Sequence, residues 1–127
     1  MKALAIPMSE AFSDVRSEED FGYTLRDFLD RFRERPDVSL LKDEPALLEP
    51  FLRDGGHADA FLAATAAWLA NKHRLRVPDW AKGSSRALDE PRFAARSHNL
   101  RMVLLQESPA EFRLRNLFVS ANALSRA

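Results

Sequence analysis

Apolar residues recur along the chain at steps of three and four positions, which is the period of amphipathic α-helices. The strongest such stretch spans residues 58–75. In it Phe61, Leu62 and Leu69 lie on one helical face, and alanines cover most of the other positions. A helix that is apolar on nearly all sides is stable only with neighbours around it. The pattern therefore predicts that residues 58–75 form a helix at the centre of the core.

A second amphipathic helix is predicted between Ser17 and Arg35. Ser17 precedes three acidic residues, so its hydroxyl can cap the free backbone N–H groups while the acids interact favourably with the helix dipole. The apolar stripe consists of Phe21, Leu25, Phe28, Leu29 and Phe32. Pro36 excludes the helical conformation at Arg35, so we expect the helix to end there.

Prolines, glycines and serines divide the rest of the chain into short elements. Pro45 is suited to be the first residue of a helix that ends at Leu52, and Gly55 with Gly56 then breaks the chain before the central helix. Around Pro78, the sequence VPDWA predicts one helical turn anchored by Trp80.

Two further helices are predicted near the C-terminus. Ser97 starts the first, and its predicted buried positions are Leu100, Met102, Val103 and Leu104. Ser108 and Pro109 start the second, with the serine as cap, proline at the first position and glutamate at the third. The end of the chain is ambiguous between a last helix and an extended tail.

The fold class predicted by these elements is all-α. We expect a compact single-domain bundle of about five to six helices around the helix at 58–75. Residues 17–127 would form this helical domain, and residues 1–16, which lack a sustained period, would form a mobile arm. The arm is apolar enough to dock on another surface or to insert into a partner subunit; its apolar residues are Met1, Leu4, Ile6, Met8, Phe12 and Val15. The only β-like patch is Leu117 to Ser120, and one strand cannot form a sheet.

Composition agrees with one folded domain. The chain has 127 residues, of which 46% are hydrophobic and 30% charged, and it has no cysteine. The absence of cysteine excludes disulfides, thiolate metal sites and thiol nucleophiles. No stretch approaches the ~20 apolar residues of a membrane span, and the first residues do not read as a signal peptide. We expect a cytoplasmic protein without membrane contact.

Charge is balanced overall but not along the chain. The net charge is zero, which argues against a protein built mainly to bind nucleic acid. Residues 1–60 carry 8 Lys and Arg against 14 Asp and Glu, and residues 61–127 carry 11 against 5. The two halves therefore have charges of −6 and +6. Either the halves fold against each other and neutralise, which we favour, or the second half presents a basic face to a partner.

Candidate chemistry is sparse. The histidines His57, His73 and His98 are too far apart in sequence for a zinc motif. No GxSxG elbow and no GxxxxGK[ST] phosphate loop occurs. The acids of the helix at 17–35 lie among arginines and are best interpreted as solvated ion pairs. The sequence predicts a protein that is not an enzyme, with no catalytic, cofactor-binding or metal-binding residue.

Arginines in the second half of the chain are interspersed with phenylalanines. The arginines are Arg92, Arg96, Arg101, Arg113 and Arg115, and the phenylalanines are Phe93, Phe112 and Phe118. Such interleaving occurs on nucleic-acid-binding surfaces. Arginine is also enriched in protein interfaces and in buried pairs with carboxylates. We favour protein contacts, internal or with a partner, over nucleic acid.

Four blocks of the sequence point to a family. They are LRDFLDRF at 25–32, AWLA at 67–70, PDW at 78–80 and ESPAEFRLRNLFVS at 107–120. Together these blocks resemble a family of small bacterial proteins of uncharacterised function. In that family the same region often follows an XRE-type helix-turn-helix domain, and its members resemble regulators or antitoxin-like proteins encoded beside nucleotidyltransferase-like toxins. The resemblance identifies no catalytic residue.

The first 16 residues are too few for a DNA-binding domain, which puts binding to a promoter in doubt and leaves the partner-binding role. The first functional hypothesis is thus a non-catalytic protein that covers the active site of a protein partner, such as a toxin encoded by a neighbouring gene. The predicted contacts are Arg113, Arg115, Asn116 and Phe118, since arginine and aromatic residues dominate interface energetics. Alternatively, Phe118 is core and the arginines pair with the acidic half. The second hypothesis is a transcriptional regulator that binds nucleic acid through the basic half. A homo-oligomer is compatible with both.

Overall fold

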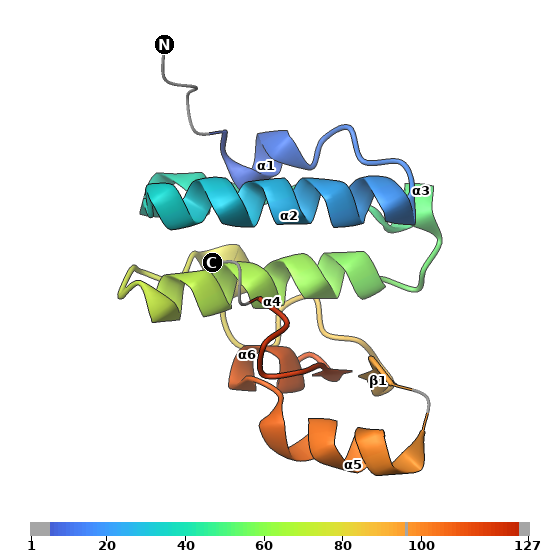
Figure 1. The fold of residues 1–127 in the computed structure, drawn as a ribbon. Coiled ribbons are helices and arrows are strands. Elements are labelled where there is room, and N and C mark those ends of the chain that lie inside the picture. The colour runs from blue at the N-terminus through green and yellow to red at the C-terminus, as the bar shows by residue number, and fades with distance from the viewer. Residues whose placement is uncertain (1–5, 96, 125–127) are drawn as a thin grey trace.

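Two long helices, α2 (Glu18–Glu34) and α4 (His57–Lys72), lie side by side and run in the same direction (Figure 1). The computed structural model describes residues 6–95 and 97–124. Aromatic contacts fix the pairing at both ends. The rings of Phe21 and Phe61 meet near the start, with centroids 6.1 Å apart, and those of Phe32 and His73 meet near the end, at 5.4 Å.

The remaining elements are short and surround this pair. They are α1 (Met8–Ala11), the 3₁₀ turns η1 (Val38–Leu40) and η2 (Asp79–Ala81), α3 (Glu49–Leu52), β1 (Arg92–Phe93), α5 (His98–Glu107), α6 (Ala110–Arg113) and β2 (Leu117–Phe118). The all-α fold class is confirmed, because the two strands have two residues each. Among the described residues, no helix has the length and apolar character needed to cross a membrane.

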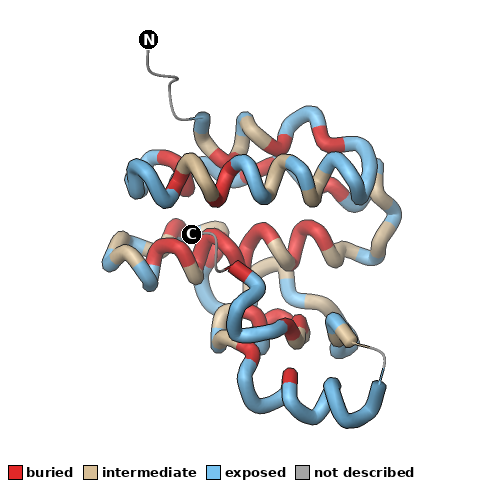
Figure 2. The backbone as a smooth tube through the Cα atoms, viewed as in Figure 1, coloured by how far each residue is buried: buried red, intermediate tan, exposed pale blue. Residues whose placement is uncertain are grey.

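Helix α4 is the centre of the core, as its sequence predicts. Its alanines and leucines are buried along most of its length (Figure 2). Helices α1 and α2 lie on one side of it and α6 lies on the other (Figure 1), and η2 also packs against it. The small alanine side chains allow elements to approach α4 closely from both sides. The helix ends at Lys72, before the predicted end at residue 75.

The predicted boundaries of α2 are also confirmed. The hydroxyl of Ser17 accepts a hydrogen bond from the backbone N–H of Asp20 at 3.1 Å, so the serine caps the helix as expected. The helix ends at Glu34, two residues before Pro36. Phe28, Leu29 and Phe32 are its buried residues, as the apolar stripe predicts.

The described part of the predicted mobile arm is packed into the core. Met8, Phe12 and Val15 are almost fully buried, and the ring of Phe12 contacts those of Phe21 and Phe28 on α2. Met8 and Phe12 are four residues apart, about one helical turn, so α1 places both on the same side. In this part of the chain the apolar residues of the predicted arm are thus docked on the body. Residues 1–5 of the predicted arm lie outside the described residues.

Helix α3 begins later than predicted, at Glu49 instead of near Pro45. The carboxylate of Asp59, buried in the first turn of α4, accepts hydrogen bonds from the backbone N–H groups of Leu48 and Glu49 at 2.7 and 3.1 Å. A cap from another helix therefore decides where α3 starts, and local sequence could not reveal it.

The segment after α5 differs from prediction in two respects. β1 and β2 form a parallel pair, in which Arg92 lies opposite Leu117 and Phe93 opposite Phe118. The prediction that residues 117–120 would have no strand partner is therefore wrong. Ser108 does not cap α6; its hydroxyl donates to the carbonyl of Leu104 or Val119 and accepts from the N–H of Val119.

Helix α5 begins after Ser97 as predicted, and Ser97 caps the backbone N–H of Leu100. Its burial is different from the prediction. Only Leu104 is buried, whereas the other predicted core positions, Leu100, Met102 and Val103, are exposed. The helix contacts the body along a narrow strip and lies at the edge of the molecule (Figure 1).

The packing of α1 can be tested with two phenylalanines. Replacing buried Phe12 with alanine should lower the free energy of unfolding by about 3–5 kcal/mol, because a large core side chain is removed. Replacing Phe51, which is half exposed and stacks only beneath the Arg16 guanidinium, should cost about 1 kcal/mol or less. Urea unfolding measures both. Equal losses for the two variants would contradict the packing of residues 8–15 in the core.

Candidate functional site

Arg115, one of the four predicted contact residues, is completely buried. Its guanidinium donates to the carbonyl oxygens of Ser85 at 2.9 Å, Glu111 at 2.7 Å and Ala81 at 2.6 Å. Burial lowers the pKa of Arg115, and the nearby Glu111 carboxylate opposes this shift. Arg115 thus joins α6 to the segment after η2, and its side chain is not accessible to a partner.

Asn116 and Phe118 also contribute to the interior. Asn116 has a left-handed backbone with φ of 63°, a conformation that asparagine adopts more readily than most residues. Its side-chain amide donates to the carbonyl of Leu88 at 2.6 Å. The ring of Phe118 is half buried and stacks on Phe93, with centroids 4.8 Å apart. Of the four predicted contact residues, only Arg113 is exposed.

The other arginines of the basic half are largely engaged within the chain. The Arg92 and Arg101 guanidinium groups donate to the backbone carbonyls of Asp54 and Ala95. Arg86 makes the predicted pairing with the acidic half: it lies 2.9 Å from Glu44 and 3.8 Å from Asp59. Most of these arginines bind carbonyl oxygens and not carboxylates. These contacts hold the guanidinium groups of Arg92 and Arg101 against the chain, although both residues remain exposed.

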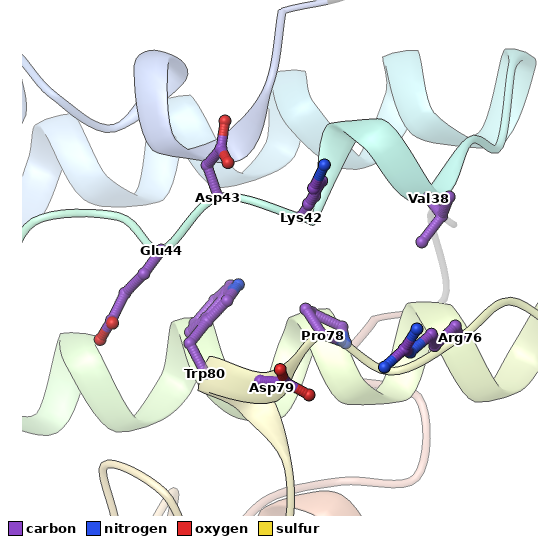
Figure 3. Close-up of a pocket in the computed structure, with 8 residues that line it drawn as sticks. All are labelled: Val38, Lys42, Asp43, Glu44, Arg76, Pro78, Asp79 and Trp80. Atoms are coloured by element: carbon purple, nitrogen blue, oxygen red, sulfur yellow. The ribbon is translucent and has the colours of Figure 1, made fainter.

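A groove of about 760 Å³ lies between two loop segments that are far apart in sequence (Figure 3). One wall is the stretch after η1, with Lys42, Asp43 and Glu44, and the other includes Arg76 and Trp80. Val38 lies on the same wall as Lys42, and Pro78 lies near Trp80 on the other wall, so the lining combines charged and apolar side chains (Figure 3). This volume is in the range of ligand-binding pockets. Sequence reasoning identified Trp80 as an anchor but did not predict the groove.

Trp80 is held in place from two sides. Its indole N–H donates to the carbonyl of Leu41 at 2.8 Å, and the Arg86 guanidinium lies 5.1 Å from its ring centroid. The Arg86 side chain is only 7% exposed and also donates to Glu44 and to the carbonyl of Pro45. Because the tryptophan cannot turn without breaking these contacts, the groove is preformed.

A second, smaller cavity of about 240 Å³ lies where the N-terminal ends of α2 and α4 meet α3 and Arg92. His57 lines it. Burial and the positive charge of Arg92 lower the pKa of His57, and the carboxylates of Asp54 and Glu18 oppose the shift. His57 is therefore neutral near pH 7. The cavity is below the usual size of a ligand site.

Helix α5 presents the largest group of exposed apolar side chains. Leu100 is 57% exposed although it lies on a helix that contacts the body through Leu104, which is 8% exposed. The full set of large apolar residues exposed on α5 and just after α6 is Leu100, Met102, Val103, Leu105 and Leu114. At 100° per residue, Leu100 and Val103 lie together on one side of α5, and Met102 and Leu105 lie together on another. We call these five residues the α5 surface. Scattered exposed apolar residues are ordinary, but several on one short helix are typical of an interaction site.

Comparison with models of known protein families, with curated proteins and with solved structures gives no match. Within the described ranges, no three His, Asp or Glu side chains are grouped so that they could hold a metal ion.

The structural role of Arg115 predicts a large difference from its neighbour Arg113. Replacing Arg115 with methionine should lower the free energy of unfolding by about 3–5 kcal/mol, because three backbone carbonyls lose their donor. The same replacement at exposed Arg113 should change it by about 0.5 kcal/mol or less. Urea unfolding of the two variants gives the comparison. Similar stability of both would refute the interior role of Arg115.

The surroundings of His57 predict a pH dependence. Its pKa in the folded protein lies below the ordinary 6.5, so the unfolded chain binds more protons and this contribution to stability is lost as pH falls below about 6.5. Replacing Arg92 with glutamine should raise the pKa of His57, since a positive charge is removed. The same change at distant Arg113 should leave it unchanged. NMR titration of the imidazole protons measures these pKa values, and a wild-type value of 6.5 or more would disprove the assignment.

Proposed function

We propose that this protein is a non-catalytic partner-binding protein, and that the α5 surface is its main contact with a protein partner. The observation that carries the proposal is the exposure of Leu100, Met102 and Val103 on a helix that buries little else than Leu104. Exposing this much apolar surface is unfavourable in water, and burial against a partner removes that cost. Apolar and aromatic side chains at the centre of an interface supply most of its binding energy.

The resemblance noted in the sequence indicates the kind of partner. It suggests an antitoxin-like protein of the cytoplasm whose partner is a toxin encoded by a neighbouring gene. In this proposal the protein acts by occlusion, since α5 covers the active site of the partner. Arg113 is the predicted contact residue that stays exposed, and it follows α5 closely in the sequence. The contact set is thus revised from four residues to Arg113 and the α5 surface.

The engagement of the arginines favours a protein partner over nucleic acid. Binding to phosphates needs a group of free cations on one surface. Here Arg86 and Arg115 are buried, and Arg92 and Arg101 donate to backbone carbonyls. Helix α5 also exposes polar and charged side chains, namely His98, Asn99, Arg101, Gln106 and Glu107. Its four exposed leucine, methionine and valine side chains suit an apolar protein surface better than a phosphate backbone.

A pull-down from the native organism tests the proposal. The tagged wild-type protein should recover one stoichiometric protein, and the proposal expects it to be the product of an adjacent gene. A double variant with Leu100→Glu and Val103→Glu should bind that product at least about thirtyfold more weakly, because charges enter the centre of the interface. Titration calorimetry with the purified partner measures the change.

The matched control introduces the same charges elsewhere. Tyr23→Glu with Leu47→Glu changes two apolar side chains that are also exposed but lie outside the α5 surface. This control should bind with wild-type affinity. Unchanged binding by the α5 variant would exclude α5 from the interface, and an eluate with abundant nucleic acid and no protein partner would support the regulator instead.

A further inference from the structure

The groove beside Trp80 is formed by residues with no function in the proposed α5 contact. It lies between the stretch 42–44 and the stretch 76–80 (Figure 3). We propose that this groove binds an extended, acidic, proline-containing segment of the protein partner. The inference adds a second contact to the proposed partner-binding function and rests on it for the source of the segment.

Unused backbone groups on both walls suit an extended segment. No group in the described part of the chain accepts a hydrogen bond from the backbone N–H of Lys42, Asp43 or Glu44, and the same holds for Arg76 on the opposite wall. An extended peptide can pair its own carbonyls with such donors, as in recognition by strand addition. A small compact ligand would leave most of them unused.

The apolar side chains that line the groove are suited to contact proline. Trp80 is fixed by its bond to Leu41 and by the Arg86 guanidinium, and Pro78 lies beside it in the lining of the groove. Rigid aromatic side chains beside a groove are the usual means of binding proline-rich segments. Such segments are already extended before binding, so they lose little conformational entropy. Trp80 is only partly buried and can therefore offer part of its ring.

Charge indicates an acidic segment. Two of the three carboxylates of the lining have cationic partners: Glu44 pairs with Arg86 at 2.9 Å and Asp79 with Lys82 at 2.9 Å. Lys42 and Arg76 form no ion pair within 4.0 Å with any described residue, and both are exposed. The charge of Arg76 also acts on the Asp79 carboxylate, whose pKa is lowered chiefly by its hydrogen bond with Lys82. When Lys82 and Arg86 are counted beside their partners, the cations at the groove outnumber its carboxylates by one, which favours a segment with acidic side chains.

The same three carboxylates argue against single-stranded nucleic acid. A nucleic acid could also stack a base on Trp80 and pair phosphates with Lys42 and Arg76. Its phosphates would then pass Asp43, which forms no ion pair within 4.0 Å with any described residue, as well as the paired carboxylates Glu44 and Asp79. A continuous phosphate backbone carries a charge at every nucleotide and meets repulsion from these carboxylates along its length. A peptide with two acidic side chains can place them away from the carboxylates of the groove. A peptide is therefore the better occupant.

The test uses the fluorescence of Trp80 in the full-length protein. The variant Trp68→Phe leaves Trp80 as the only tryptophan, since the chain has two. The probe is the blocked peptide Asp-Leu-Pro-Leu-Asp, which we expect to shift Trp80 emission to shorter wavelength as it covers the ring. The comparison probes are the same peptide with lysine in place of both aspartates, and a short oligothymidylate.

Charge reversal locates the binding. In the Trp68→Phe background, Lys42→Glu with Arg76→Glu should weaken binding of the acidic peptide roughly five- to tenfold, because two exposed ion pairs are replaced by repulsion. The matched control, Arg33→Glu with Lys72→Glu, changes net charge equally at two exposed positions outside the groove and should bind as before. Circular dichroism confirms that each variant is folded.

Three results would overturn the inference. They are no change in Trp80 emission with the acidic peptide, unchanged affinity in the groove variant, or tighter binding of the oligothymidylate. The peptide assay contains no partner protein, so its outcome is independent of the pull-down. Peptide binding without a recovered partner would support the groove alone, whereas a recovered partner without peptide binding would support the α5 surface alone.

Discussion

The buried guanidinium of Arg115 is the contact on which the C-terminal part of the structure depends. It holds the carbonyls of Ala81, Ser85 and Glu111 in one place, and a planar group with five donors is the side chain best suited to this task. Next to it, Leu88, Arg92 and Ala94 donate backbone hydrogen bonds to the carbonyls of Arg115, Asn116 and Phe118. These hydrogen bonds join residues 81–94 to residues 111–118. Helix α5, which connects the two segments, is thereby held at the edge of the molecule.

Both proposed contacts follow from this arrangement. Helix α5 is connected to the body at its two ends and through Leu104, so most of its apolar side chains have no internal partner. On the other side of the same segment, Arg86 fixes Trp80 and joins it to Glu44. Polar contacts in the interior thus give two rigid surfaces, one apolar and one mixed, and a preformed surface binds a partner with less loss of conformational entropy.

The sequence predicted helices correctly where neighbouring residues determine the position and the ends of the helix. The alanine-rich pattern predicted α4, and Ser17 with Pro36 predicted both ends of α2. It did not predict a helix boundary that depends on a residue distant in sequence. The example is the start of α3, which is capped by Asp59 of α4. For Arg115 the signal was ambiguous, since arginine among phenylalanines is typical of both interfaces and interiors, and its acceptors at Ala81 and Ser85 are thirty or more residues away. The apolar residues of α5 led to a prediction of burial within this chain. An apolar pattern shows that a helix has surface to bury, but it does not show whether the covering element belongs to the same chain or to another.

Hydrogen–deuterium exchange on the chain alone and with its recovered partner tests the central claim most directly, which is that the edge helix α5 is the surface a partner covers. We expect slower exchange in the complex for residues 98–107, whereas α4, already buried in the free protein, should exchange at the same rate in both. Unchanged exchange along α5, with protection confined to the exposed face of α2, would contradict the claim.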